Sequence, residues 1–336
     1  MTQSQVAILV AALGAFISLV VAVISRMTQK DLEQLKAGLE EKKSEKDARR
    51  DYEYEARKRL YQECEPLLFE LYELSENALH RIYSLARSAR KGNLGLTGSW
   101  LDSPGYYMAS TIYNLLAPIA VYKLIQRRLT FVDLTVEPHI RSQYILAKLI
   151  AVSFTDDFDF ARCTPQRPYS PNDHAWQALR KTDPAQYWKQ GIPLGRLDVA
   201  AEGLILQESS GSLRLRSFGE FETEYHDKKS TIGTGFSSVT DMFLGFHPKF
   251  RPCLWRMLIT QAHIYEALLK ISQGGGAEPV IALSPIPQNR RNLFEWRQKA
   301  VDATDEDVLV EPFSVAAEYL KMRIGPQLTL KLGGDV

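Results

Sequence analysis

Cysteine is scarce in this sequence, which contains Cys64, Cys163 and Cys253 and no other cysteine. An odd and widely scattered set is unlike a disulfide framework and is typical of a protein from a reducing compartment. The six histidines are also scattered, and no two have the spacing of a metal site. We therefore expect plain thiols and no cofactor, and the residues give no support to a disulfide-stabilised secreted module or a zinc module.

The familiar catalytic and nucleotide-binding motifs are missing as well. The chain contains no HExxH, GxSxG, CxxC or kinase motif and no repeat of fixed period. Glycines gather at 91–98 and 231–235, but neither segment has the GxxxxGK[ST] spacing of a phosphate-binding loop. These absences make an enzyme less expected without excluding one.

A strong net charge is a further absence. Forty-one basic and forty acidic residues leave a formal charge of +1, so no global field attracts nucleic acid, and we expect no nucleic-acid partner. With 45% hydrophobic residues, the chain has enough apolar side chains to bury a large core.

The most informative feature that is present is a run of nineteen residues without a charge, from Val6 to Ile24. At about 1.5 Å per helical residue, such a run spans roughly the hydrocarbon thickness of a bilayer. A cleaved signal peptide would have a positive leading segment and a shorter apolar core, whereas Met1–Gln5 contains no Lys or Arg. Residues 1–25 therefore predict an uncleaved membrane anchor that contacts lipid. Its apolar residues include Val6, Leu9, Leu13, Phe16, Leu19, Val20 and Ile24.

The distribution of basic residues predicts the orientation of this anchor. No Lys or Arg precedes the apolar run, whereas several follow it closely, and such residues remain on the cytoplasmic side. We expect a single-pass protein of the cell (inner) membrane, with its N-terminus outside and its C-terminal domain in the cytoplasm. The basic residues that follow are Arg26, Lys30, Lys36, Lys42 and Lys43.

Residues 26–59 have mixed charges and only one glycine, a composition typical of a solvated helical stalk. Leu32, Leu35 and Leu39 begin a heptad-like spacing, which Lys42, Lys43 and Lys46 interrupt. Two interpretations remain open: a single charged helix, or a self-associating stalk with a short coiled coil. The second is favoured by small residues that allow membrane helices to approach closely. These are Ala11, Gly14, Ala15 and Ser18.

Residues 60–325 predict a large, mainly α-helical cytosolic domain with at most a few short strands, followed by a tail at 326–336. Apolar residues recur at three- and four-residue spacing through most of it. Pro66 predicts a kink or restart and Pro118 a break. The glycine-rich turn at 91–98 predicts the end of the first helix of this domain. The spacing also predicts helices at 194–206, 250–271, 292–301 and 308–322. Strands are plausible at 129–136, 213–216 and in the tail.

The least regular segment is 155–195, which contains five prolines and several acidic residues. Long loops often carry function, so this is the preferred region for a site. Asp156, Asp157 and Asp159 have the oxygen ligands that divalent cations prefer, and His174 is a candidate base or ligand. Cys163 lies beside Arg162, where a thiol is more readily ionised. The competing and stronger interpretation is that these residues cap helices or lie on the surface.

These observations favour a single-pass membrane-anchored protein whose cytosolic helical domain binds itself or a protein partner, as a scaffold or sensor. Two alternatives remain. The first is a membrane-tethered enzyme with a site in 155–195, and the second is a membrane-perturbing effector that clusters on a signal.

Overall fold

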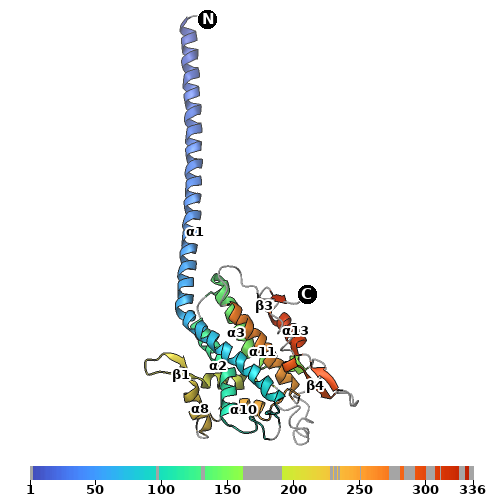
Figure 1. The fold of residues 1–336 in the computed structure, drawn as a ribbon. Helices are drawn as coiled ribbons and strands as arrows, with labels where there is room; N and C mark the ends of the chain where they lie inside the picture. Colours follow the sequence, from blue (N-terminus) through green and yellow to red (C-terminus); the bar gives the residue numbers. More distant parts are fainter. Residues whose placement is uncertain are drawn as a thin grey trace. The chain divides into compact units, whose positions relative to one another are not determined.

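The computed structural model shows a mainly helical chain that divides into two compact units, Met1–Arg59 and Leu60–Val336. This confirms the expected fold class, and the strands are few and short (Figure 1). The structure describes residues 3–95, 98–129, 133–161, 191–227, 230, 233, 235–249, 251–271, 281–283, 292–299, 307–310, 312–324 and 330–332.

Helix α1 (Gln3–Arg90) begins in the first unit and ends in the second. In the second unit its residues Cys64 and Leu71 are buried in the core. The helix continues through Pro66 as one element, so the predicted restart does not occur. Proline removes one backbone hydrogen bond, and burial of the residues on both sides outweighs that loss.

The end of α1 is set by a glycine, as the sequence predicts. Gly92 has a φ of 76°, in the left-handed region that favours glycine. The amide of Lys91 donates to the carbonyl of Arg87 at 3.0 Å, and that of Asn93 donates to Ser88 at 2.9 Å. These bonds satisfy the last carbonyls of the helix and stop its propagation.

Helix α2 (Tyr106–Arg128) corrects a second expectation about proline. It runs without interruption through Pro118, where the sequence predicts a break. Sixteen of its residues are buried, including Pro118 itself. Packing on all sides therefore outweighs the roughly 3 kcal/mol that proline costs inside a helix. Its burial also identifies α2 as a core helix and not a second membrane span.

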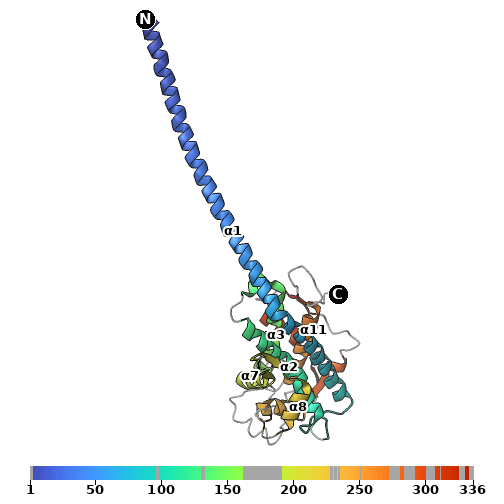
Figure 2. The ribbon, with the colours of Figure 1, turned by 90° about the vertical axis from the view of Figure 1, so that its left-hand side faces the viewer.

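Helix α11 (Pro252–Ile271) is the centre of the second unit. All of its side chains are buried except Glu266, Leu269 and Lys270. It packs against α3 and α13, while α7 and α8 pack against α2 (Figure 2). The remaining helical elements are η1 (Leu134–Val136), α3 (Pro138–Ser153), α4 (Asp157–Ala161), α7 (Leu194–Gly203), α8 (Phe218–His226), α10 (Ser237–Phe243) and α13 (Pro312–Ile324).

The described strands form three separate pairs. The alternating pattern at 213–216 is confirmed as half of an antiparallel hairpin, and the tail does pair as a strand, parallel to an earlier segment. The pairs are β1 (Ile205–Gln207) with β2 (Leu213–Leu215), β3 (Ile281–Leu283) with β6 (Leu330–Leu332), and β4 (Trp296–Lys299) with β5 (Asp307–Val310).

Four further expectations are wrong in part. The predicted helix at 194–206 ends at Gly203, and its last two residues belong to strand β1. The predicted helix at 292–301 is replaced after residue 294 by strand β4, and the predicted helix at 308–322 begins only at Pro312 because β5 precedes it. In the link at 129–136, residues 134–136 form a 3₁₀ turn and not a strand. Strands β4 and β5 are stabilised by hydrogen bonds to each other. The spacing of apolar residues within one segment cannot indicate such pairing with another segment.

Arg251 is a charged side chain in the core, only 5% exposed. Its guanidinium donates to the carbonyls of Asp241, Met242 and Leu244, which are the unsatisfied carbonyls at the end of α10. Burial lowers its pKa to about 10, so it remains charged at neutral pH. This buried cation connects the start of α11 to the end of α10.

His263 lies on the buried side of α11 and is only 7% exposed, with its ring at 5.9 Å from that of Phe313. Burial, aided by the charge of Lys270, lowers the pKa of His263 to about 4. The imidazole of His263 therefore binds a proton less readily in the folded state than in the unfolded state.

We expect the protein to lose stability as the pH falls from about 6.5 towards 4, because the unfolded state takes up a proton that folded His263 resists. Between pH 7 and pH 5 this amounts to roughly 2 kcal/mol. Urea unfolding of the detergent-solubilised chain at both pH values measures it. His263→Leu should reduce the pH dependence of the free energy of unfolding. The control His80→Leu, at an exposed histidine, should not reduce it. An equal pH dependence in the two variants contradicts the role given to His263.

Candidate functional site

The acidic residues singled out from the sequence lie at the start of the short helix α4. The carbonyl of Asp156 accepts from the amides of Asp159 at 3.0 Å and Phe160 at 3.3 Å, so Asp156 occupies the position just before the helix. Asp157 and Asp159 are in its first turn. Cys163 and His174, the other two candidates, lie outside the described residues.

Two side chains of α13 contact these carboxylates. The hydroxyl of Tyr319 donates to Asp156 Oδ2 at 2.6 Å, and Arg323 Nη2 donates to the same oxygen at 2.6 Å. Arg323 also donates to Asp159 Oδ2 at 2.9 Å. Tyr319 and Arg323 are four residues apart and therefore lie on one side of the helix. The network ties α13 to α4.

The surroundings of this network oppose the ionisation of Tyr319. Asp156 has a side chain only 17% exposed and faces the permanent charge of Arg323. Burial and the hydrogen bond to Asp156 raise the pKa of Tyr319 above its ordinary value. A phenol with a raised pKa is a neutral hydrogen-bond donor and a poor general base.

The last turn of α4 is held from the other side by α11. Arg256, which is fully buried, donates from Nη1 to the carbonyl of Phe160 at 3.0 Å. The thiol of Cys253 donates to the carbonyl of Asp157 at 3.1 Å. The ring of Phe160 lies 4.5 Å from that of Tyr319. Both ends of this short helix are thus fixed by groups from distant parts of the sequence.

Chemically, this arrangement is that of an ion pair which fixes three helices. Among the described residues, no group of three or more His, Cys, Asp and Glu side chains could hold a metal ion. The basic and aromatic partners Arg323, Tyr319 and Arg256 were not identified from the sequence. Only the four-residue spacing of Tyr319 and Arg323 could have suggested a shared face, and nothing in the sequence indicates that the face meets Asp156.

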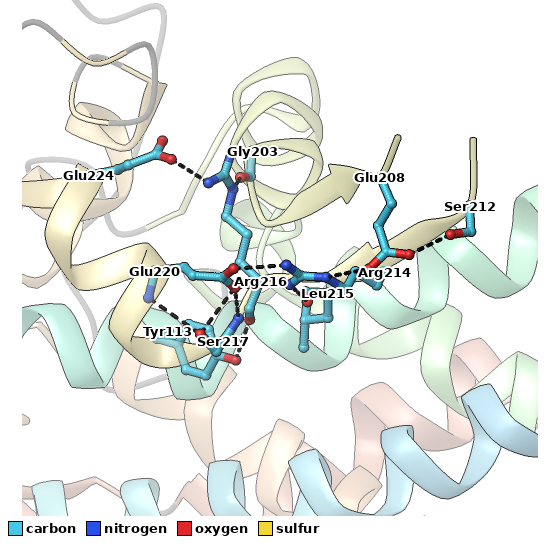
Figure 3. Close-up of polar contacts among 10 residues, drawn as sticks. All are labelled: Tyr113, Gly203, Glu208, Ser212, Arg214, Leu215, Arg216, Ser217, Glu220 and Glu224. Atoms are coloured by element: carbon cyan, nitrogen blue, oxygen red, sulfur yellow. Dashed lines mark hydrogen bonds and ion pairs between the residues drawn. The ribbon is translucent and has the colours of Figure 1, made fainter. Parts of the chain in front are cut away.

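A second polar cluster connects the hairpin β1–β2 to helix α8 (Figure 3). Arg214 donates to Glu208 at 3.1 Å and, through two nitrogens, to Glu220 at 2.9 and 2.8 Å. Glu220 also accepts from Ser217 in a capping box. Arg214, with help from Ser217, lowers the pKa of Glu220 to about 2. Arg214 is thus held between two carboxylates, and the cluster joins the hairpin to α8.

The anchor residues are arranged differently, because nothing in the described chain covers them. Val6, Leu9, Leu13, Phe16, Leu19, Val20 and Ile24 are all exposed on α1. This part of α1 is long and apolar enough to cross a membrane, with no residue of its most apolar window buried. Among the described residues, the longest run of exposed large apolar side chains therefore lies in α1.

Comparison with known protein families, with curated proteins and with solved structures finds no match.

Gly191 packs directly against the α4 region. A Cβ on Gly191 would lie 2.6 Å from Asp157 Cβ, whereas a Cβ on Gly195 in α7 meets nothing within 4 Å. We therefore expect Gly191→Ala to destabilise the protein by about 1 to 3 kcal/mol through overpacking. Gly195→Ala should be neutral or stabilising by up to about 1 kcal/mol. Thermal unfolding of the two variants measures the difference, and equal midpoints contradict the close packing.

The ion pair between Asp156 and Arg323 is measurable by a double-mutant cycle with Asp156→Asn and Arg323→Gln. We expect a coupling free energy of about 1 to 2 kcal/mol, because the pair is partly shielded and hydrogen-bonded. The matched control is the exposed pair of Arg127 and Glu202 at 2.9 Å, where coupling should stay below about 0.5 kcal/mol. A coupling no larger than the control shows that the network does not fix α13.

Proposed function

We propose that this is a single-pass membrane protein that holds its helical domain at the cytoplasmic face of the cell membrane and acts there by binding, as a scaffold or sensor. The observation that carries the proposal is the exposed apolar run of α1. Nineteen residues between Val6 and Ile24 carry no charge, and the large side chains among them are exposed.

Exposure of this run to water is strongly unfavourable. Each buried Å² of apolar surface contributes about 25 cal/mol, and side chains such as Leu13 and Phe16 are more than half exposed. A helix is the form in which a single segment can enter hydrocarbon, because it satisfies its own backbone. Burial of the apolar run in lipid thus removes the free-energy cost of its exposure to water, and the helix keeps its conformation.

The proposed orientation rests on the charges at the two ends of the run. No Lys or Arg precedes Val6, whereas Arg26 and Lys30 follow within one helical turn or two. Basic residues near a span are retained in the cytoplasm. The second unit, which begins at Leu60, is then on the cytoplasmic side.

Binding is favoured over catalysis by the way the polar groups are used. The acidic candidates Asp156 and Asp159 both form ion pairs with Arg323, and Glu208 and Glu220 both form ion pairs with Arg214. The exposed apolar surface, in contrast, extends beyond the span to Leu32, Leu35 and Leu39 of α1. Such a surface suits contact with another protein chain.

Insertion of α1 is tested by Leu13→Lys with Phe16→Lys, which places two charges near the middle of the run. At about 2.5 to 3.5 kcal/mol for each lysine, we expect the protein to leave the membrane pellet for the soluble fraction or to be degraded. The control Met27→Lys with Ala37→Lys adds the same charges outside the run and should remain in the pellet. A doubly charged variant that resists carbonate extraction as well as the parent contradicts the anchor.

The orientation is tested in the same preparation by protease treatment of intact spheroplasts and of inverted vesicles. The domain after Leu60 should be digested in inverted vesicles alone. Digestion in intact spheroplasts overturns the cytoplasmic placement.

A further inference from the structure

One side of α1 carries an apolar seam that continues beyond the membrane run. Thr28, Leu32, Leu35 and Leu39 follow one another at alternating spacings of four and three residues, the repeat of a two-stranded coiled coil. The three leucines are 49%, 65% and 60% exposed, so no other part of the described chain covers them. A helix in water keeps such a seam covered by a partner.

The same alternation extends backwards through the membrane run without a change of register. Stepping back from Thr28 by three and four residues gives Ser25, Val21, Ser18, Gly14, Ala11 and Ala7. The hydroxyl of Ser18 donates to the carbonyl of Gly14 at 2.9 Å, and that of Thr28 donates to Ile24 at 2.8 Å. These hydroxyls are satisfied within the helix, so the side presents small, close-packing groups to a neighbour.

Charged residues beside the seam indicate which neighbour fits. Lys36, Lys43 and Arg50 follow the seam positions on one side, whereas Asp31 and Glu45 precede them on the other. In two parallel helices in register, a residue that precedes the seam meets the residue five positions later on the partner. Asp31 would then face Lys36 of a second copy, and Glu45 would face Arg50.

These pairings are self-complementary, so the partner with the matching sequence is this chain itself. Arg50 already contacts Asp47 at 3.4 Å and Asp51 at 3.9 Å within its own helix. Both contacts are highly exposed, and exchanging one for a contact with Glu45 of another copy costs little. Two chains anchored in one membrane in the same direction also have the parallel orientation that the pairing needs.

We propose that α1 binds a second copy of this chain as a parallel, in-register pair of helices along the seam from Ala7 to Leu39. The inference rests on the proposed function, since the anchor sets the common direction. It deepens that function by naming the partner. The apolar contact ends at Leu39, because the next seam positions, Lys42, Lys46 and Arg49, place like charges opposite each other; the flanking pair of Glu45 and Arg50 is then the last contact between the two copies.

Disulfide crosslinking in native membranes tests the seam. Two full-length variants are compared: Leu35→Cys, in the seam, and Ala37→Cys, on the opposite side of the helix. Both carry Cys163→Ser, and the remaining cysteines, Cys64 and Cys253, are buried. Cβ atoms must approach to about 4 Å for a disulfide to form, so mild oxidation should convert most of the Leu35→Cys chain to a covalent dimer and little of the Ala37→Cys chain. Equal crosslinking at the two positions, or none at Leu35→Cys, overturns the proposal.

A charge exchange tests the register and the identity of the partner. One chain carries Lys36→Glu with Arg50→Glu, and a second, differently tagged chain carries Asp31→Lys with Glu45→Lys. Each alone places like charges opposite each other, whereas the mixed pair restores every contact. We expect crosslinking through Leu35→Cys to fall several-fold for either variant alone and to recover in the mixed pair; no preference for the mixed pair overturns the parallel register.

The seam variant Leu32→Lys with Leu35→Lys separates this inference from the membrane anchor. It should remain in the membrane pellet and run as a monomer in detergent, whereas the matched control Met27→Lys with Ala37→Lys should remain both membrane-bound and dimeric. A parent chain that is membrane-bound and monomeric overturns the pairing and leaves the anchor intact. A parent chain that is absent from the membrane overturns the proposed function instead.

Discussion

The exclusion of apolar side chains from water is the constraint on which this structure depends, and the two units meet it in different ways. In the second unit, α11 buries nearly its whole surface against α3 and α13. In the first unit no second layer exists, and the side chains of α1 remain exposed. A helix that already satisfies its own backbone needs only an apolar surrounding, and both lipid and another helix are surroundings of this kind.

Charges in the second unit serve mainly to join elements that are distant in the sequence. Arg323 connects α13 to α4, Arg251 connects α11 to the end of α10, and Arg214 connects the hairpin to α8. Each guanidinium meets carboxylates or helix-end carbonyls, for which its planar fork of donors is well suited. Since these partners are internal, the ion pairs and hydrogen bonds stabilise the domain.

Patterns in the sequence predicted those features of the fold that depend on interactions between residues close in the chain. The apolar N-terminal helix, the end of α1 at Gly92 and the extent of α11 follow from periodicity and turn chemistry, which act within a few residues. Pro118 was misjudged because its tolerance depends on the helices packed around α2. The contact of Asp156 with Arg323 joins residues 167 positions apart, and neither residue's neighbours indicate the other. The candidate acids were therefore found, but their role as one half of an ion pair was not predictable.

The proposed pairing along the seam of α1 depends on two weak contributions that share one heptad register. Close packing of small residues around Gly14 gives a membrane pair only modest stability, and a water-exposed seam of three leucines is too short to hold two helices alone. On one continuous helix, however, formation of either contact brings the other into place, so that the second acts at a high effective concentration. Charged residues from Lys42 onward end the apolar seam short of the domain. In the proposed pair, the domains of two copies would be held near each other at the membrane while each keeps its own fold, which is the arrangement that a scaffold requires.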